Sequence, residues 1–149
     1  MARIVSMIFA MKFVATFCTG LFAGAALYIT VVEHPARMEC GTTLAATEFG
    51  PSYRRATVMQ ASLAIAGFLA AMVSFVFVSN YAWLLGGICI VAVVPFTLIV
   101  ILPTNKKLLD PSLNRNSQAA RQLLVQWGRL HAVRTVLSLA AFVLFLWTR

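Results

Sequence analysis

The stretch ATVMQASLAIAGFLAAMVSFVFVSNYAWLLGGICIVAVVPFTLIVILPTN (residues 56–105) contains no charged side chain. A helix rises ~1.5 Å per residue, so this stretch is about twice as long as a helix that crosses the ~30 Å hydrocarbon core of a membrane. Its polar break, Ser79-Asn80, lies near the middle. The stretch therefore predicts two antiparallel membrane helices, at about 51–78 and 81–102, joined by a tight turn.

Prolines refine the expected ends of these two helices. Pro51 follows Gly50 and suits the first turn of a helix, where its missing N–H is not needed. Pro95 is expected to kink the next helix, and Pro103 to perturb or end it.

A further uncharged run, residues 13–32, predicts a helix before this pair, at about 5–32. It is longer than a cleavable signal sequence needs, so we expect it to be retained. A proline disfavours helical geometry in the residue that precedes it. Pro35 is therefore expected to end this helix at His34.

The last helix is predicted from a length problem. Residues 135–148 are uncharged but span only ~21 Å as a helix, which is too short to cross a membrane. The preceding residues are amphipathic and begin with a good cap at Asn116 or Ser117. One helix at about 117–148 solves the problem and brings Arg134 and His131 to the membrane interface.

The whole composition agrees with a membrane protein. The chain is 61% hydrophobic, with 12 Lys and Arg and 4 Asp and Glu among 149 residues. Soluble domains carry about a quarter charged residues. The sequence therefore predicts an all-α, polytopic membrane protein, a single four-transmembrane-helix bundle over residues 1–149. It excludes a disordered chain, a coiled coil, a disulfide-rich scaffold and an ordinary cytosolic enzyme.

The net charge of +8 points to membrane lipids rather than nucleic acid. The basic residues lie in short segments between long apolar runs, unlike the basic face of a soluble nucleic-acid-binding module. Anionic lipid head groups are the expected partners, and no nucleic acid is expected. Most Lys and Arg residues fall in or near the expected loops 33–50 and 103–116. The positive-inside rule then predicts that both loops are cytosolic and that both termini lie on the opposite side.

Small residues mark the expected helix seams. Gly20 and Gly24 form a GxxxG step, and Ala64, Gly67 and Ala71 form a second row. We expect these rows to pack within the chain. The alternative is a homo-oligomer that forms through the same seams.

Polar side chains gather at the loop-side ends of all four expected helices. They are Glu33 and His34 on the first, Tyr53 and Gln60 on the second, Asn105 and Lys106 on the third, and Trp127, His131 and Arg134 on the fourth. The last three are spaced i, i+4 and i+7, so they share one helix face. Ionisable groups at membrane depth indicate a functional site, and bundle sites are built from facing helices. The pattern predicts one polar, cationic, aromatic-lined pocket.

Each of these residues also has a structural interpretation. Glu33 is equally suited to a salt bridge with Arg134 or Arg54. Trp127 suits a membrane-interface anchor, and His131 suits a hydrogen bond to a loop carbonyl. A metal site would need Glu33 and both histidines together, and no spacing such as HxxxH or ExxH supports it. We therefore expect no metal.

Four segments carry a resemblance to a known family. They are VVEHPARM (31–38), FGPSYRRATVMQ (49–60), LPTNKKL (102–108) and WGRLHAVR (127–134). Together they are similar to the anthrone-oxygenase-like family of small membrane proteins, and the resemblance covers nearly the whole chain. It implies four membrane helices. It also implies oxidation of an anthrone to an anthraquinone by O₂, without a metal, flavin or other cofactor.

The resemblance also implies roles for the clustered residues. His131 is the first choice for the base that takes a proton from the substrate, with Glu33 orienting it or serving in its place. The other expected roles are charge stabilisation by Arg134 and Lys106, hydrogen bonding by Asn105 and Gln60, stacking by Trp127 and Tyr53, and further substrate contact by His34. The expected substrate is a small, flat, hydrophobic aromatic molecule.

Two other functions remain open from the sequence. One is a non-catalytic membrane module that binds a lipid or a quinone at the same cationic pocket. The other is an accessory subunit that docks a partner protein through its small-residue seams.

Overall fold

The computed structural model describes residues 2–148, and every regular element in this range is helical. The elements in chain order are α1 (Ala2–Tyr28), the π-helical turn η1 (Ile29–Glu33), α2 (His34–Glu39), α3 (Thr42–Val78), α4 (Tyr81–Phe96), the π-helical turn η2 (Thr97–Ile101), α5 (Leu102–Leu108) and α6 (Gln118–Trp147). They join into four continuous helices, each long and apolar enough to cross a membrane. The predicted all-α, four-helix membrane fold is confirmed.

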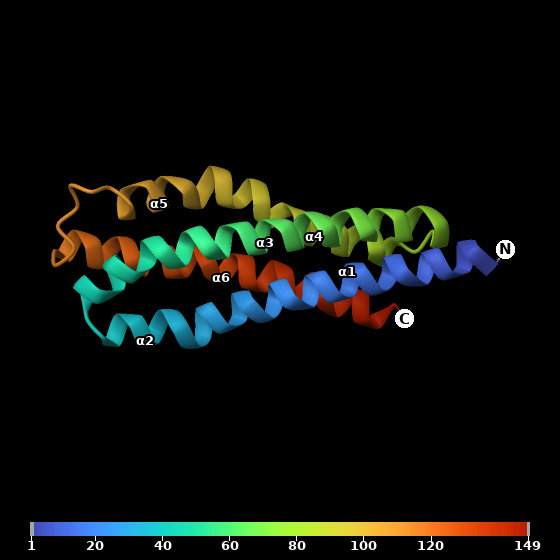
Figure 1. Ribbon diagram of the computed structural model, residues 1–149, viewed down its shortest axis with the longest axis horizontal. Helices are drawn as coiled ribbons and strands as arrows, with labels where there is room; N and C mark the ends of the chain where they lie inside the picture. The colour runs from blue at the N-terminus through green and yellow to red at the C-terminus, as the bar shows by residue number, and fades with distance from the viewer. Residues whose placement is uncertain (1, 149) are drawn as a thin grey trace.

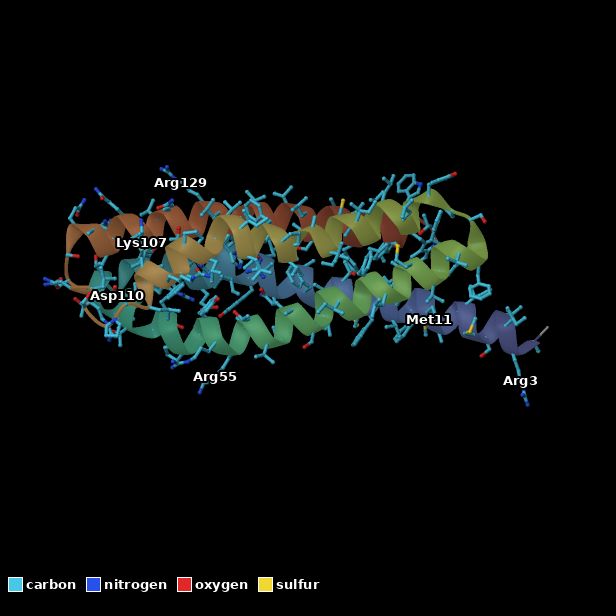
Figure 2. All side chains as sticks on the ribbon, turned by 90° about the horizontal axis from the view of Figure 1, so that it is seen from above. Arg3, Met11, Arg55, Lys107, Asp110 and Arg129 are labelled. Atoms are coloured by element: carbon cyan, nitrogen blue, oxygen red, sulfur yellow. The ribbon has the colours of Figure 1, made fainter. Side chains whose placement is uncertain are left out.

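The four long helices lie side by side (Figure 1). Both chain ends lie at one end of the bundle, the terminal end, while α2, α5 and the start of α6 lie at the other, the loop end. α1 packs against α3 and α6, and α4 packs against the same two helices. Figure 2 shows Lys107 and Asp110 at the loop end and Arg3 at the terminal end. Which face of the membrane each end meets stays a prediction.

The turn between α3 and α4 forms at Ser79-Asn80, as predicted. Ser79 adopts the left-handed conformation, with φ 53°, and its N–H donates to the Phe75 carbonyl at 2.7 Å. The Asn80 side chain accepts a hydrogen bond from the Ala82 N–H at 3.0 Å and so caps α4. At the start of α6, Ser117 caps in the same way. The predicted last helix is confirmed to within one residue at each end.

The first connection is much shorter than predicted. The sequence predicted a loop over residues 33–50, but α2 continues to Glu39 and α3 begins at Thr42. The break is at Gly41, whose φ of 95° is a backbone conformation that glycine adopts readily. Pro51, expected to start the helix, lies inside it.

Pro35 was predicted to end a helix and Pro103 to perturb or end one, and neither proline ends its helix. The chain passes from η1 into α2 through Pro35, and from η2 into α5 through Pro103. Each proline follows a π turn. In η1, for example, the His34 N–H donates to the Ile29 carbonyl, five residues back. The extra residue in a π turn moves the carbonyls that a proline ring would otherwise strike, so the helix continues.

Small residues pack within the chain along most of the predicted seams. A Cβ added to Gly20 would come within 2.7 Å of the Phe142 ring on α6. A Cβ added to Gly24 would meet nothing within 4 Å. In the second row, all three residues are buried, namely Ala64, Gly67 and Ala71. Close helix approach thus depends on Gly20 and the second row rather than on the whole GxxxG step.

Candidate functional site

A small internal cavity lies in the loop half of the bundle, where η1, α2, α3 and α6 meet. Its lining residues are Ile29, Arg37, Phe49, Ser52, Tyr53, Ala56, Thr57, Gln60, Trp127, His131 and Arg134. Five of them were singled out from the sequence: Tyr53, Gln60, Trp127, His131 and Arg134. The i, i+4, i+7 spacing on α6 and the polar face of α3 therefore do meet at one point.

His131 lies at the centre of a chain of hydrogen bonds and is only 2% exposed. Its Nδ1 is 3.1 Å from the Thr30 hydroxyl, which is 2.8 Å from the Thr135 hydroxyl. Thr135 in turn donates to the Ala26 carbonyl at 3.1 Å. These bonds therefore connect the imidazole on α6 to the continuous first helix, through Thr30 in η1 and the Ala26 carbonyl in α1.

One order of donors satisfies all three of these bonds and assigns a tautomer to the imidazole ring. Thr135 donates its hydroxyl proton to the Ala26 carbonyl, and Thr30 donates to the Thr135 oxygen. The Thr30 oxygen then accepts a proton from His131 Nδ1. With this order, Nε2 is the unprotonated nitrogen of the neutral ring and is free to act as a base.

Trp127 is the centre of an aromatic cluster beside this imidazole. Its ring stacks on His131 with centroids 4.8 Å apart and lies 5.3 Å from the ring of His34. On its other side it meets Phe49 edge to face at 5.3 Å. Phe49 stacks in turn on Tyr53 at 5.7 Å. Aromatic surfaces thus form one wall of the cavity.

Arg134 brings a cation into the cavity without a carboxylate partner. Its Nη2 donates to the Gln60 side-chain oxygen at 2.6 Å, and the guanidinium lies over the Phe22 ring at 5.5 Å. Within residues 2–148, no ion pair neutralises it. Arg134 Nε and Gln60 Nε2 are buried without hydrogen-bond partners. The guanidinium is therefore available to an anion that enters the cavity.

Arg37 is a cavity residue that sequence reasoning missed. It is 6% exposed and forms ion pairs with Glu33 and with Glu48, the latter at 3.1 Å. Its guanidinium also lies 5.9 Å from the centroid of the Trp127 ring. The sequence placed Arg37 in a surface loop. The signal that could have revealed it was the i, i+4 spacing of Glu33 and Arg37, which pairs opposite charges on a helix.

Glu33 does not take the ion-pair partner that the sequence suggested. Its carboxylate pairs with Arg37 and accepts a hydrogen bond from the Ser52 hydroxyl at 3.1 Å. The alternative salt bridge to Arg134 or Arg54 is therefore wrong. The group that holds the His131 ring is Thr30, so Glu33 does not orient the imidazole.

The remaining predicted site residues lie outside the cavity lining. His34 contacts the far side of the cluster through the Trp127 ring. Asn105 is 1% exposed, and both polar atoms of its amide lack a partner, but it lies on α5 beyond the cavity. Lys106 is exposed at the loop end. The α5 residues thus do not join the group that α3 and α6 bring together.

The cavity is closed in this structure. Its volume is about 20 Å³, enough for one water molecule. Binding pockets for small organic molecules usually have volumes of ~300–1,000 Å³. The partly exposed side of the cavity is formed by α3, through Ser52, Tyr53 and Ala56. A larger ligand would have to move side chains on this side.

No metal-binding cluster is found among residues 2–148, where no three His, Cys, Asp or Glu side chains come together suitably. The two histidines each contact the Trp127 ring, with ring centroids 5.3 Å away for His34 and 4.8 Å away for His131. The chemistry available in the cavity is thus that of an imidazole, an amide, two guanidiniums, the hydroxyls of Ser52, Tyr53 and Thr57, and several aromatic rings.

Comparison with known proteins assigns the family. The family model described as anthrone oxygenase matches residues 49–144. Anthrone oxygenase tpcL of Aspergillus fumigatus is 30% identical over 139 residues, which cover 87% of this chain and 84% of its own. The chain belongs to the anthrone oxygenase family. No solved structure shows a significant match.

The anthrone oxygenase family range includes most of the cavity. It begins at Phe49 in α3 and ends near the end of α6, so it contains all of the lining residues except Ile29 and Arg37. The resemblance seen in the sequence is therefore confirmed at the level of the family.

Proposed function

We propose that this protein is an oxygenase that uses O₂ to oxidise a flat, phenolic, anthrone-like substrate in the loop-half cavity, without a metal or flavin. The observation that carries the proposal is that the same cavity is lined by His131, whose Nδ1 is held by Thr30, and by Arg134, which has no carboxylate partner. A base next to a cation suits a reaction in which removal of a proton creates an anion. The family and the activity that gives tpcL its name support the same reaction class.

The chemistry requires little beyond a base and charge stabilisation. Removal of one benzylic proton from an anthrone gives an enolate, which passes one electron to O₂ and forms superoxide. The substrate radical and superoxide join through a new C–O bond, and the resulting peroxide takes up a proton. Loss of the second benzylic proton and cleavage of the O–O bond leave a carbonyl and water. One oxygen atom of O₂ thus enters the product, and the other leaves as water.

Each step has a group in the cavity that suits it. His131 Nε2 takes the first proton, and the hydrogen bond from Nδ1 to Thr30 keeps the ring in the required tautomer. Arg134 stabilises the enolate and the superoxide, an effect that is strong where water is excluded. Trp127 and Tyr53 stack on the ring system, and Gln60 holds the guanidinium in position.

The closed cavity means that substrate entry includes a movement. Tyr53 is partly exposed and stacks on Phe49, so rotation of the Tyr53 ring is the smallest change that would enlarge the space between α3 and Trp127. A lipophilic substrate dissolved in the membrane then enters past α3.

The test is oxygen uptake by the purified protein in detergent, supplied with a simple anthrone, with metal and flavin measured in the same sample. We expect uptake well above the spontaneous rate and a fall of at least ~100-fold in His131→Ala. Arg129→Gln is the matched control, because Arg129 is exposed on the same helix (Figure 2). Full uptake by His131→Ala would refute the assignment of the base. No uptake above background by the native protein would favour a lipid- or quinone-binding module.

The sequence left two candidates for the base, His131 and Glu33, and the Glu33→Gln variant distinguishes between them. Glu33 is held by Arg37 and Ser52, so this variant is expected to retain most of the oxygen uptake. A loss as large as that of His131→Ala, in a variant that is still folded, would give Glu33 a direct role.

A further inference from the structure

A second and larger space lies in the terminal half of the bundle. This groove has a volume of about 580 Å³ and is lined by Phe9, Lys12, Phe13, Thr16, Phe17, Gly20, Leu21, Trp83 and Phe142. Its lining comes from α1, the start of α4 and the last part of α6. Its volume falls within the ~300–1,000 Å³ range of ligand sites. It is thus well separated from the loop-half cavity and shares no residue with it.

The α1 side of the groove is a stripe of apolar side chains. Phe9, Phe13, Phe17 and Leu21 recur every fourth residue, and each is about half exposed or more. The rings of Phe13 and Phe17 stack with centroids 5.6 Å apart. Such a stripe suits a hydrocarbon chain that runs parallel to the helix.

One end of the stripe carries the polar groups. The Lys12 ammonium lies 5.8 Å from the centroid of the Trp83 ring. Trp83 is 1% exposed, and its indole N–H is buried without a hydrogen-bond partner. Trp83 follows the Asn80 cap by three residues, or ~5 Å along α4, so Lys12 lies close to the terminal end of the bundle. Lipid head groups meet a membrane helix at this level.

No acidic side chain of the protein can neutralise Lys12. The four Asp and Glu residues of the chain lie at the end of η1 (Glu33), in α2 (Glu39), in the first turns of α3 (Glu48) and in the loop after α5 (Asp110). These segments form the opposite end of the bundle (Figure 1). A second copy inserted in the same direction would bring its own acids to that same far end. Among residues 2–148, no acidic side chain lies at the terminal end to supply a counter-charge for Lys12.

We propose that the groove binds an anionic phospholipid. Its phosphate lies at Lys12, and one acyl chain follows the phenylalanine stripe from Lys12 toward Leu21, about 14 Å into the membrane. The ammonium supplies the charge attraction, and the apolar stripe supplies contact area along the chain. This inference is independent of the proposed oxygenase activity, because no residue of the groove belongs to the loop-half cavity.

The test uses quenching of Trp83 fluorescence by lipids that carry bromine on the acyl chain. Trp147 is 88% exposed at the same end and Trp127 lies in the loop-half cavity, so the experiment is done in a Trp127→Phe, Trp147→Phe background, in which Trp83 is the remaining tryptophan. The protein, in neutral-lipid nanodiscs, receives increasing fractions of brominated phosphatidylglycerol or brominated phosphatidylcholine. We expect phosphatidylglycerol to reach half-maximal quenching at a roughly fivefold lower fraction, as expected for one Lys near the anionic surface.

Two variants decide the outcome. Lys12→Gln is expected to abolish the difference between the two lipids, whereas Arg3→Gln, which removes an exposed cation outside the groove at the same end, should preserve it (Figure 2). Thermal unfolding verifies that both variants are folded. Equal quenching by the two lipids in the native protein would overturn the proposal, as would a preference that survives in Lys12→Gln. Weak quenching by both lipids together with a dimer by native mass spectrometry would assign the groove to a second copy.

Discussion

The two halves of the bundle are built from the same four helices but are held together by different forces. In the terminal half, the buried side chains are mainly alanines and aromatic rings, as in the cluster of Ala15, Ala71, Trp83 and Phe145. In the loop half, the buried side chains include Arg37, Gln60 and His131. The terminal half depends on shape, while the loop half depends on directional hydrogen bonds and ion pairs.

This difference suggests that the terminal half contributes mainly to the stability of the protein and the loop half mainly to its function. Close packing around glycine stabilises the terminal half without any ionisable group other than Lys12 near the groove. The loop half leaves polar atoms unpaired, among them Arg134 Nε and Gln60 Nε2, which lowers its stability. Such a cost is tolerated where a ligand later supplies the missing partners. Substitutions in the two halves should therefore affect different measured properties.

The largest effect is expected for Arg134→Met. It removes the cation that has no carboxylate partner, so oxygen uptake with an anthrone should fall by about 100-fold or more. The thermal unfolding midpoint should change little or rise, because a buried charge is also removed. The control is Arg129→Met on the exposed face of α6, which should retain uptake. If Arg134→Met retained its oxygen uptake, the Arg134 cation would not be needed for the reaction, and the loop half would no longer differ from the terminal half in function.

The second-largest effect is expected for Gly86→Ala in the terminal half, which should lower the stability of the protein. A Cβ added at Gly86 would overlap the fully buried Phe145 ring, so Gly86→Ala should lower the free energy of unfolding by about 1–3 kcal/mol. Gly24→Ala is the matched control, since its Cβ would meet nothing within 4 Å. Thermal unfolding in detergent measures both. Equal midpoints for the two variants would show that the terminal half is less tightly packed than the structure indicates.

A smaller effect is expected for Thr30→Val, which removes the hydrogen-bond partner of His131 Nδ1. One such bond has a net value of ~0.5–1.5 kcal/mol, so uptake should fall by roughly 3- to 10-fold. ¹⁵N NMR of the His131 ring should show a mixture of tautomers instead of the Nδ1–H form. Thr30→Ser should restore both the tautomer and the rate. A purely structural role for Thr30 would leave the tautomer unchanged.

The smallest effect is expected for Lys106→Gln. The sequence suggested that Lys106 stabilises charge in the site, but the structure shows it exposed on α5, outside the cavity lining. Oxygen uptake should therefore change by less than about twofold, within the range of surface substitutions. A large loss would mean that α5 moves toward the cavity during turnover and that the site extends further than the closed structure indicates.

Much of the fold was predictable because lipid as the solvent imposes simple rules on length and polarity. The uncharged stretch 56–105 and its Ser79-Asn80 break were enough to place two helices. The site was predictable wherever residues on one regular helix share a face, as Trp127, His131 and Arg134 do.

The remaining features depend on backbone geometry that local patterns do not reveal. Proline rules predicted helix ends at Pro35 and near Pro103, because they do not anticipate a π turn before the ring. The missing helical turns then made Arg37 a loop residue in the prediction, although it is buried beside Trp127. The partner of Glu33 could not be chosen from sequence, since several cations lay within reach of the expected helix end.

The π turn at Ile29–Glu33 also constrains the length of the chain. Removing one residue from it would let the helix revert to ordinary α geometry without a break. The segments on the two sides would keep their relative rotation, because the π turn already offsets the ~100° that its extra residue would add to an α-helix. Arg37, beyond the turn, would then still face Trp127, but the Pro35 ring would lose the wider turn that now accommodates it. A single-codon deletion here should therefore disturb the helix at Pro35 rather than change its register, even if it removed only a lipid-facing valine such as Val31.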